Sequence, residues 1–418
     1  GIRSERQLAK EVQVNVAYRW FLNLNLTDKV PDHSTISQNR RRRFNGTDVF
    51  RQLFDEVVLY AYDNNFIEGK ILYTDSTHLK ANANKKKLIR KIVSENTKAY
   101  LEELEKAVED DRKAHGKKPL PPKKTNEDTP TKEIKVSTTD PDSGYLAREG
   151  KPEGFHYLDH RTCDNKHNLI TDVHITPGST NDSTVYLDRL DHQVERFGFE
   201  VEAVGLDSGY HTARICKTLT DRDIFAVVAY RKPGGPKGLY RKSKFAYDPT
   251  NDCYTCPRGH ILKYRSTTRA GFLEYVSDSK VCCNCPNRKE CTNSKNCQKV
   301  VTRHVWERYY EKVKENRKTE RGEYIKRRRS ETIERSFADA KQLHGYRYGR
   351  FRGREKVETQ ALMTAIAQNI KKMVLLMTRA NLNPEGKGKR HCKSSLSSLF
   401  EQILALLGVE MRIFVPSV

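Results

Sequence analysis

The sequence has few apolar residues and no long apolar run. Hydrophobic residues make up 36% of the 418 positions, with two tryptophans and four methionines. A membrane-spanning helix needs about 20 consecutive apolar residues, and no window comes near that length without a charge, so we expect no membrane span. No apolar stretch follows a basic start, so no secretory signal is expected and the predicted location is cytoplasmic. The chain opens on Gly1 rather than Met, from which we expect the N-terminal segment to be truncated.

Acidic residues are too few to balance the basic ones. Lysine and arginine number 77 against 54 aspartates and glutamates, a formal net charge of +23. A surplus of this size is an argument about partners, and the commonest polyanion is nucleic acid. The positive charges are clustered, which favours nucleic-acid binding over a merely basic surface. The clusters are Arg40–Arg43, Lys85–Lys87, Arg327–Arg329 and Arg347–Arg354.

The ten cysteines are unevenly placed, with seven between positions 253 and 297. Such local clustering in a large basic chain favours a metal site over a disulfide framework. Two Cys-x₂-Cys knuckles can supply four thiolates to tetrahedral zinc, and the segment between them reads as a β-hairpin. Free thiols and an iron–sulfur cluster are the alternatives to this structural Zn²⁺. The predicted zinc ligands are Cys253, Cys256, Cys282 and Cys285, with Cys291 as the alternative ligand.

Residues 1–66 predict a helical, DNA-binding domain. Apolar residues recur at every fourth position from Leu8 to Leu24, which indicates a helix. Pro31 ends this helix, and Asp32 or Ser34 can cap a second one that runs into four arginines. A helix, a break and a basic helix are typical of a helix-turn-helix, with an ordinary helical hairpin as the alternative. Another amphipathic helix is expected over 47–66.

Residues 67–243 predict an α/β domain. We expect strands at 71–74, 156–159, 169–175, 201–206 and 224–229, with helices at 183–197 and 212–222. A hairpin followed by strand-helix-strand units indicates a mixed sheet with helices on its faces. A charged insertion at 86–150 interrupts it, predicted as a helix to about 112 and then an exposed linker.

The remaining chain divides into three predicted segments. Residues 244–300 form the cysteine-rich, zinc-ribbon-like insert, and 301–380 are helical and complete the α/β domain. Residues 381–418 are a tail with a short helix at 396–407.

Three acids far apart in the sequence form the candidate catalytic group. Asp75 and Asp207 each follow a predicted strand, and Glu334 lies in a predicted helix with Lys341 seven residues later. Ligands gather beyond the strand ends of open α/β sheets. Three carboxylates there could hold two Mg²⁺ (or Mn²⁺) ions about 3.5–4 Å apart, as in phosphodiester displacement. Taken singly, a strand-end Asp can instead cap a helix, and Glu334 can be a surface ion pair.

The motifs around these acids resemble those of bacterial insertion-sequence transposases of the DDE superfamily. The resemblance is carried by residues 73–84 (YTDSTHLKANAN), 207–210 (DSGY) and 333–337 (IERSF) with Lys341, and by 31–37 (PDHSTIS) and 176–183. It covers most of residues 1–380. It implies a ribonuclease-H-like core, metal-dependent cleavage at transposon ends, strand transfer into target DNA, and a homodimer on paired DNA ends.

One position and the start of the chain depart from the family pattern. The chain opens on Gly1, from which we expect part of the DNA-binding domain to be missing. Many relatives carry an arginine four residues before the catalytic glutamate, where this chain has Ser330. The neighbouring Glu331 is a competing candidate, but the seven-residue spacing to Lys341 and the helix geometry favour Glu334.

The function predicted from the sequence is that of a DNA transposase. A related nuclease without strand transfer and a non-catalytic DNA-binding protein derived from a transposase are the alternatives. The helix ends that carry basic residues suit phosphate contacts, with Tyr346, Tyr348 and Phe351 available to unstacked bases. The predicted DNA-binding residues are Arg40, Arg41, Arg42, Arg43, Arg335, Lys341, Arg347 and Arg350.

Overall fold

A computed structural model describes residues 2, 4–94, 98–121, 131–147, 153–230 and 238–382. The chain divides into two compact units. The first comprises residues 1–91, 134–209 and 320 onward, and the second comprises 92–133 and 210–319. The helix predicted at 396–407 lies outside the described residues. None of the described helices is long and apolar enough to cross a bilayer.

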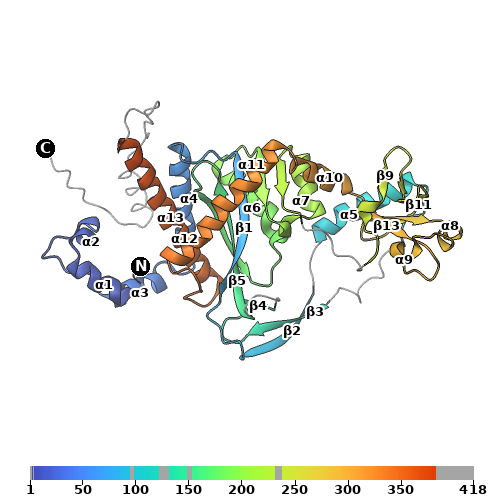
Figure 1. Cartoon of the computed structure of the whole chain (residues 1–418). Coiled ribbons are helices and arrows are strands. Elements are labelled where there is room, and N and C mark those ends of the chain that lie inside the picture. Colours follow the sequence, from blue (N-terminus) through green and yellow to red (C-terminus); the bar gives the residue numbers. More distant parts are fainter. Residues whose placement is uncertain are drawn as a thin grey trace. The chain divides into compact units, whose positions relative to one another are not determined.

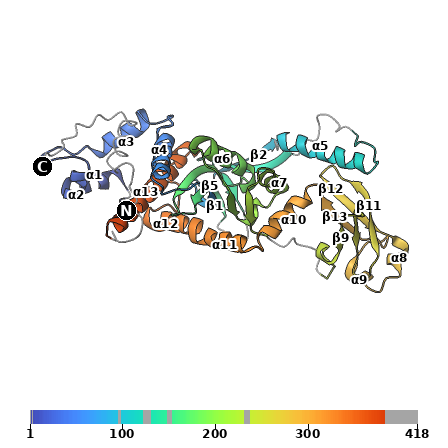
Figure 2. The same cartoon turned by 90° about the horizontal axis from the view of Figure 1, so that it is seen from above.

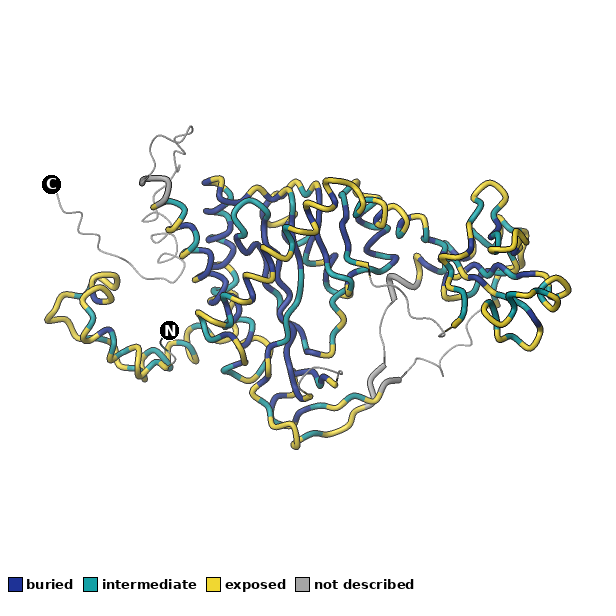
Figure 3. Tube along the Cα trace, viewed as in Figure 1, coloured by how far each residue is buried: buried dark blue, intermediate teal, exposed yellow. Residues whose placement is uncertain are grey.

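The first unit begins with three short helices, α1 (Glu5–Val14), α2 (Val16–Phe21) and α3 (His33–Arg42). Asp32, one of the two caps that the sequence allows, caps α3 by accepting a hydrogen bond from the Ser34 amide at 2.8 Å. Only Val12 and Arg19 are buried among the described residues of this segment. Figure 3 shows α1 to α3 as largely exposed, so the arginines of α3 lie at the surface.

A mixed sheet forms the centre of the first unit (Figure 1). Strand β5 (Gly154–Asp164) pairs antiparallel with β1 (Ile71–Lys80), with β6 (Ile170–Pro177) and with the short β4 (Gly144–Leu146). Strand β7 (Ala203–Leu206) follows helix α6 (Asp182–Phe197) and pairs parallel with β1. Every residue of β5 is buried, although six of its eleven residues have polar or charged side chains. Figure 3 shows these strands as the buried part of the unit.

Strand β1 is longer than the sequence predicts, and Asp75 lies within it rather than at its end. Pairing with β5 continues from Leu72 to Lys80, because β5 runs alongside the whole strand. Pairing with β7 stops at Thr74, opposite Leu206. Asp75 therefore still pairs with β5 but lies one residue beyond the last pair that β1 makes with β7.

Helices cover both faces of this sheet. Figure 2 shows α6 on one side of β1 and β5, and α11 (Glu320–Arg329) with α12 (Arg335–Leu343) on the other. Between α11 and α12 lies η3 (Ser330–Glu334), a π-helical turn that contacts β1 and β5. The long α13 (Arg354–Leu382) packs on β6 and on α4 (Val49–Asp63). Asn369 of α13 exchanges two hydrogen bonds with the backbone of Ile170, which fixes α13 to β6.

The insertion at 86–150 contains more regular structure than predicted. It forms β2 (Leu88–Ser94), α5 (Lys98–Ala114) and β3 (Thr131–Ser137), and β2 pairs with β3. The prediction of an exposed linker after the helix is therefore wrong for residues 131–147, the described second half of that segment. Asp140 is completely buried there and accepts hydrogen bonds from Tyr157 Oη at 2.7 Å and from the Gly353 amide at 3.0 Å.

The second unit contains a small helical part and a five-stranded sheet. Helices α7 (Ala213–Asp221) and α10 (Glu307–Asn316) pack on each other, and α10 also packs on β8 (Phe225–Val228). The sheet order is β13-β12-β11-β10-β9. Its elements, with the short helices that follow β12, are β9 (Ala246–Asp248), β10 (Cys253–Thr255), β11 (Ile261–Thr267), β12 (Phe272–Ser277), α8 (Ser279–Cys283), α9 (Arg288–Cys291) and β13 (Val300–His304).

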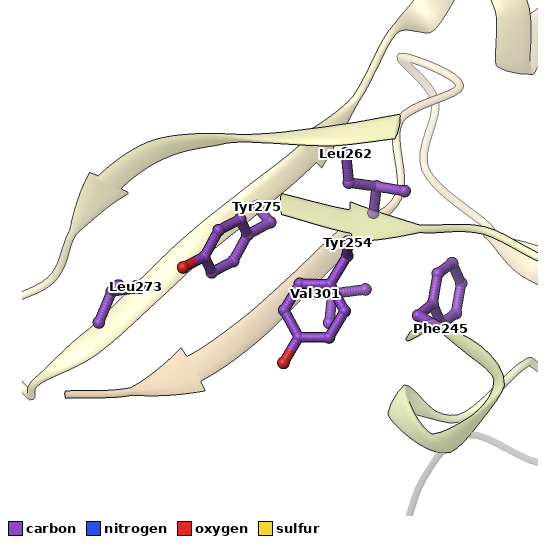
Figure 4. Packing of buried hydrophobic residues seen from close by; sticks show 6 residues of the cluster. All are labelled: Phe245, Tyr254, Leu262, Leu273, Tyr275 and Val301. Carbon is purple, nitrogen blue, oxygen red and sulfur yellow. The ribbon is translucent and has the colours of Figure 1, made fainter. Parts of the chain in front are cut away.

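The predicted hairpin of this module is present as β11 and β12, which are antiparallel. Figure 4 shows the apolar cluster of the module, formed by Phe245, Tyr254, Leu262, Leu273, Tyr275 and Val301. Helix α5 of the insertion packs on β11, and its Arg112 donates to the Thr267 carbonyl at 2.8 Å. The cysteine-rich module is thus a folded sheet that the charged insertion supports.

Candidate active site

Asp75 and Asp207 lie next to each other because of strand register. Thr74 and Leu206 are the last residues of the parallel β1–β7 pairing, and each is followed by an aspartate, Asp75 within β1 and Asp207 just after β7. Neighbouring strands lie about 4.8 Å apart, so two carboxylates at matched positions meet at this point of the sheet. The two aspartates that the sequence places 132 positions apart are therefore brought together by the fold.

Arg329 joins these two aspartates to Glu334. Its Nη1 donates to Asp75 Oδ2 at 2.8 Å, and its Nη2 lies 3.6 Å from Asp207 Oδ1 and 3.8 Å from Glu334 Oε1. The three predicted acids thus converge on one guanidinium. The Asp75 side chain is 19% exposed, whereas that of Glu334 is 58% exposed, so the site opens to solvent on the glutamate side.

A π-helical turn explains how Arg329 reaches this position. Residues four apart share a face of an α-helix, and the residue four before Glu334 is Ser330. Hydrogen bonds of a π-helix run between residues five apart, which brings Arg329 to the side of Glu334. Arg329 therefore lies beside Glu334, where a regular α-helix would place Ser330. π-turns are frequent at functional sites.

Glu331 is directed to a different partner. Its carboxylate pairs with Arg328 at 3.0 Å, and Arg328 also donates to the Asn165 carbonyl at 2.9 Å. Arg329 instead makes its ion pairs with Asp75, Asp207 and Glu334. The geometry favours Glu334 over Glu331 as the third acid.

The environment of Asp75 makes its charge costly. Burial raises the pKa of Asp75 above its ordinary value, although Arg329 and the Ser76 amide act against this rise. The Ser76 hydroxyl donates to Asp182 Oδ1 at 2.7 Å, so a fourth carboxylate contacts the residue that follows Asp75.

The predicted basic residues are distributed around this unit. Lys341 donates to Thr77 Oγ1 at 2.7 Å, two residues beyond Asp75. Arg40 of α3 lies 5.1 Å from the ring centre of Phe351, which links the N-terminal helices to the loop before α13. Arg40 and Phe351 line two adjoining pockets of about 950 and 860 Å³. Their basic lining comprises Arg40, Arg41, Arg350, Arg352 and Lys356 in one and Arg40, Lys341, Arg347 and Arg350 in the other.

The aromatic residues expected to contact bases differ in accessibility. Tyr348 is 49% exposed, but Tyr346 is completely buried. Tyr346 is therefore wrong as a base-contacting residue, because its ring packs against the guanidinium of Arg161 at 5.2 Å.

Arg161 is a buried residue near the third acid that the sequence did not reveal. Its buried guanidinium donates to Asp159 at 2.9 Å and to Gln368 of α13 at 3.0 Å. It also reaches Ser336, two residues after Glu334, at 3.3 Å. Arg161 therefore connects β5 to the helix that carries the third acid. A strand rich in polar residues gives no sequence signal that one of them is wholly buried.

The cysteine-rich module brings together four thiols. They line one cavity of about 220 Å³ and are Cys256, Cys282, Cys285 and Cys291. Burial raises the pKa of Cys291, and the nearby thiols of the other three raise it further. Cys253, which was among the four preferred ligands, is buried in β10 and does not line this cavity. The Arg258 amide donates to Cys256 Sγ at 3.4 Å, a contact that stabilises a thiolate.

Neither cluster is a finished metal site. Among the described residues, no group of three or more His, Cys, Asp or Glu side chains is arranged to hold a metal ion as it stands. At the acidic cluster, the Arg329 guanidinium lies where the carboxylates converge.

Two family models match the chain. One, described as a transposase DDE domain, matches residues 255–374, which include Glu334 and Lys341 but neither aspartate. The other, described as a transposase domain, matches residues 1–42. These matches confirm the resemblance to insertion-sequence transposases of the DDE superfamily.

Solved structures add distant similarities. The Mos1 transposase paired-end complex with left transposon end aligns at 11% identity and a TM-score of 0.19, over 55% of this chain and 59% of that chain. The piggyBac transposase synaptic complex with hairpin DNA aligns at 10% identity and a TM-score of 0.22, over 96% of this chain and 69% of that one. These TM-scores are low, so the alignments do not establish a shared fold. No curated protein matches the chain.

Proposed function

We propose that this protein is a DNA transposase that cleaves transposon ends and transfers them into target DNA. The observation that carries the proposal is the convergence of Asp75, Asp207 and Glu334 on one guanidinium. Two of these acids come from neighbouring strands and the third from a helix that covers the sheet. The antiparallel strands β6, β5 and β1, extended by the parallel β7, support a ribonuclease-H-like core.

The donor set fits a hard divalent cation. Carboxylate oxygens are the ligands that Mg²⁺ and Mn²⁺ prefer, and these three already share a positive group. Asp75, Asp207 and Glu334 would hold the metal ions. Such ions supply activation of an attacking oxygen and stabilisation of a leaving oxygen.

The chain's own residues would bind and orient DNA at this site. Lys341, held next to β1 by Thr77, is placed to contact a phosphate close to the acids. The arginines of α3 and of the loop before α13 extend this basic surface, and the net charge of +23 supplies long-range attraction. Water would first attack the phosphodiester at a transposon end, and the freed 3′-hydroxyl would then attack target DNA. Both steps are in-line displacements that need no covalent bond to the protein.

The cysteine module would bind one structural Zn²⁺. Thiolates are ligands that zinc prefers, and four of them fill a tetrahedral shell without an open position for catalysis. The shared cavity supports the set Cys256, Cys282, Cys285 and Cys291, in which Cys291 takes the place of Cys253. The thiol of Cys282 lies 3.2 Å from Ser277 Oγ at the end of β12, so the metal would tie α8 to the sheet.

A homodimer on paired DNA ends and a place at the nucleoid complete the proposal. Both are implied by the resemblance to transposases that join two ends.

A strand-transfer assay tests the proposal against its two alternatives. Labelled oligonucleotides that carry transposon ends are incubated with target plasmid and Mg²⁺. Joined products support a transposase. Cleaved but unjoined oligonucleotides indicate a nuclease, and binding without cleavage indicates a non-catalytic DNA-binding protein.

A further inference from the structure

Arg329 occupies the space that the three candidate metal ligands share. One guanidinium nitrogen donates to Asp75, and the other lies within 3.8 Å of both Asp207 and Glu334. The Arg329 side chain is only 15% exposed, so water and salt screen these contacts weakly. A single positive charge thus offsets part of the repulsion among three carboxylates.

A divalent cation would compete for the same oxygen atoms. Mg²⁺ binds carboxylate oxygens at about 2.0–2.1 Å, and it would have to approach between the groups that Arg329 now bridges. Two positive groups among the same three carboxylates would lie a few ångströms apart and repel each other. Arg329 in its present position and a bound cation would therefore compete for the same carboxylate oxygens.

We propose that Arg329 is an internal counter-ion, which holds the three carboxylates together before a divalent cation binds and is displaced from them when one does. The inference rests on the proposed two-metal function and concerns the regulation of that same site. Arg329 is thus a positioning residue. It keeps Asp75, Asp207 and Glu334 converged, and it lowers the affinity of the site for the cation that must replace it.

Two consequences separate this role from that of an ordinary structural ion pair. Removing the guanidinium takes away a competitor, so the cation should bind more tightly. The same change leaves three acids without their counter-ion, so the metal-free protein should become less stable. A purely structural ion pair would show the second effect without the first.

Arg328 provides a matched control. It is the adjacent residue on the same helix, and its replacement removes the same charge. Its guanidinium pairs with Glu331 at 3.0 Å and donates to Asn168 at 3.1 Å, away from the three acids.

The test is calorimetric titration of Mn²⁺ into the full chain without DNA, for wild type, Arg329→Gln, Arg329→Lys, Arg328→Gln and Asp75→Asn. We expect Arg329→Gln to bind Mn²⁺ about 10-fold more tightly than wild type, the factor that corresponds to one lost charge-assisted hydrogen bond. Arg328→Gln should bind as wild type does, and Asp75→Asn should bind weakly. Thermal unfolding is the second readout, with Arg329→Gln melting below wild type without metal and gaining more from saturating Mn²⁺.

The possible results distinguish failure of the counter-ion role of Arg329 from failure of the proposed metal site. Affinity in Arg329→Gln that is equal to or below that of wild type overturns the inference and leaves the proposed metal site intact. If wild type does not bind Mn²⁺, or if Asp75→Asn binds it as tightly as wild type does, the proposed function fails and the inference fails with it. If Arg329→Gln does not fold, Arg329→Lys decides, because a lysine cannot bridge three acids and should also bind Mn²⁺ more tightly than wild type.

Discussion

Replacing Arg161 with methionine should destabilise the unit that carries the candidate active site by about 3–5 kcal/mol, the usual cost of breaking a buried ion pair from one side. Both Arg161 and Asp159 have no exposed side-chain surface, and their N–O distance is 2.9 Å. Methionine fills much of the volume of arginine, so the loss comes from the stranded Asp159 carboxylate rather than from a cavity.

Further contacts place the effect at the helix of the third acid. The Arg161 guanidinium donates to Ser336 and Gln368 and lies 5.2 Å from the ring centre of Phe337. Losing these contacts should loosen η3 and α12, which carry Glu334 and Lys341. We therefore expect amides of β5 and α12 to exchange hydrogen faster in the variant than in wild type.

Hydrogen exchange measured peptide by peptide, together with urea unfolding, tests this expectation. The double variant Asp159→Leu/Arg161→Met is the control, because it removes both charges and leaves neither stranded. It should be more stable than Arg161→Met alone. A single variant as stable as wild type, or a double variant no better than the single, would refute the reasoning.

Three other properties of the chain can be tested directly. DNA binding should weaken steeply with salt, and the slope of log binding constant against log salt concentration should report several phosphate contacts; a slope near zero would contradict the role given to the charge. If α3 is a recognition helix, replacing Arg41 and Arg42 with alanine should reduce binding to transposon ends more than binding to random DNA. Wild-type protein purified without added metal should contain about one zinc per chain. The Cys291→Ser variant should lose this zinc, whereas the Cys253→Ser variant should keep it. Zinc below a tenth of an equivalent in wild type would refute the site. Burial raises the pKa of Asp172, but two neighbouring arginines outweigh burial and hold the folded pKa below its ordinary value. Its ionised form therefore adds stability above about pH 4, and this stability is lost as pH falls through the lower folded pKa. The stability gap between wild type and Asp172→Asn in urea unfolding should close in acid, and a gap independent of pH would contradict this account.

Local signals in the sequence predicted several elements well. The start of α3 near Asp32, the β11–β12 hairpin and the α6 helix all depend on contacts within a few residues. Such contacts are encoded by capping residues, turns and periodicity, which a sequence displays directly.

Features that depend on distant partners were harder to predict. The full length of β1 is fixed by β5, and most of β5 was missed because its polar side chains are buried against partners elsewhere in the chain. The π-helical turn shifts the helix register by one residue, so no regular periodicity could place Arg329 beside Glu334. Spacing alone also could not decide between Cys253 and Cys291, because both fit the distances that a zinc site allows.

The central claim is that Asp75, Asp207 and Glu334 act as one metal-holding group, and cleavage by charge-neutral variants tests it most directly. Asp75→Asn, Asp207→Asn and Glu334→Gln keep the shape of each side chain and remove the charge. Each should abolish Mg²⁺-dependent cleavage and strand transfer while leaving binding to transposon ends nearly intact, and combined variants should lose no more than single ones. Glu331→Gln, which changes a neighbouring acid paired with Arg328, should retain activity. Loss of activity in Glu331→Gln but not in Glu334→Gln would contradict the choice of the third acid, and Mg²⁺-dependent cleavage by all three triad variants would contradict the mechanism itself.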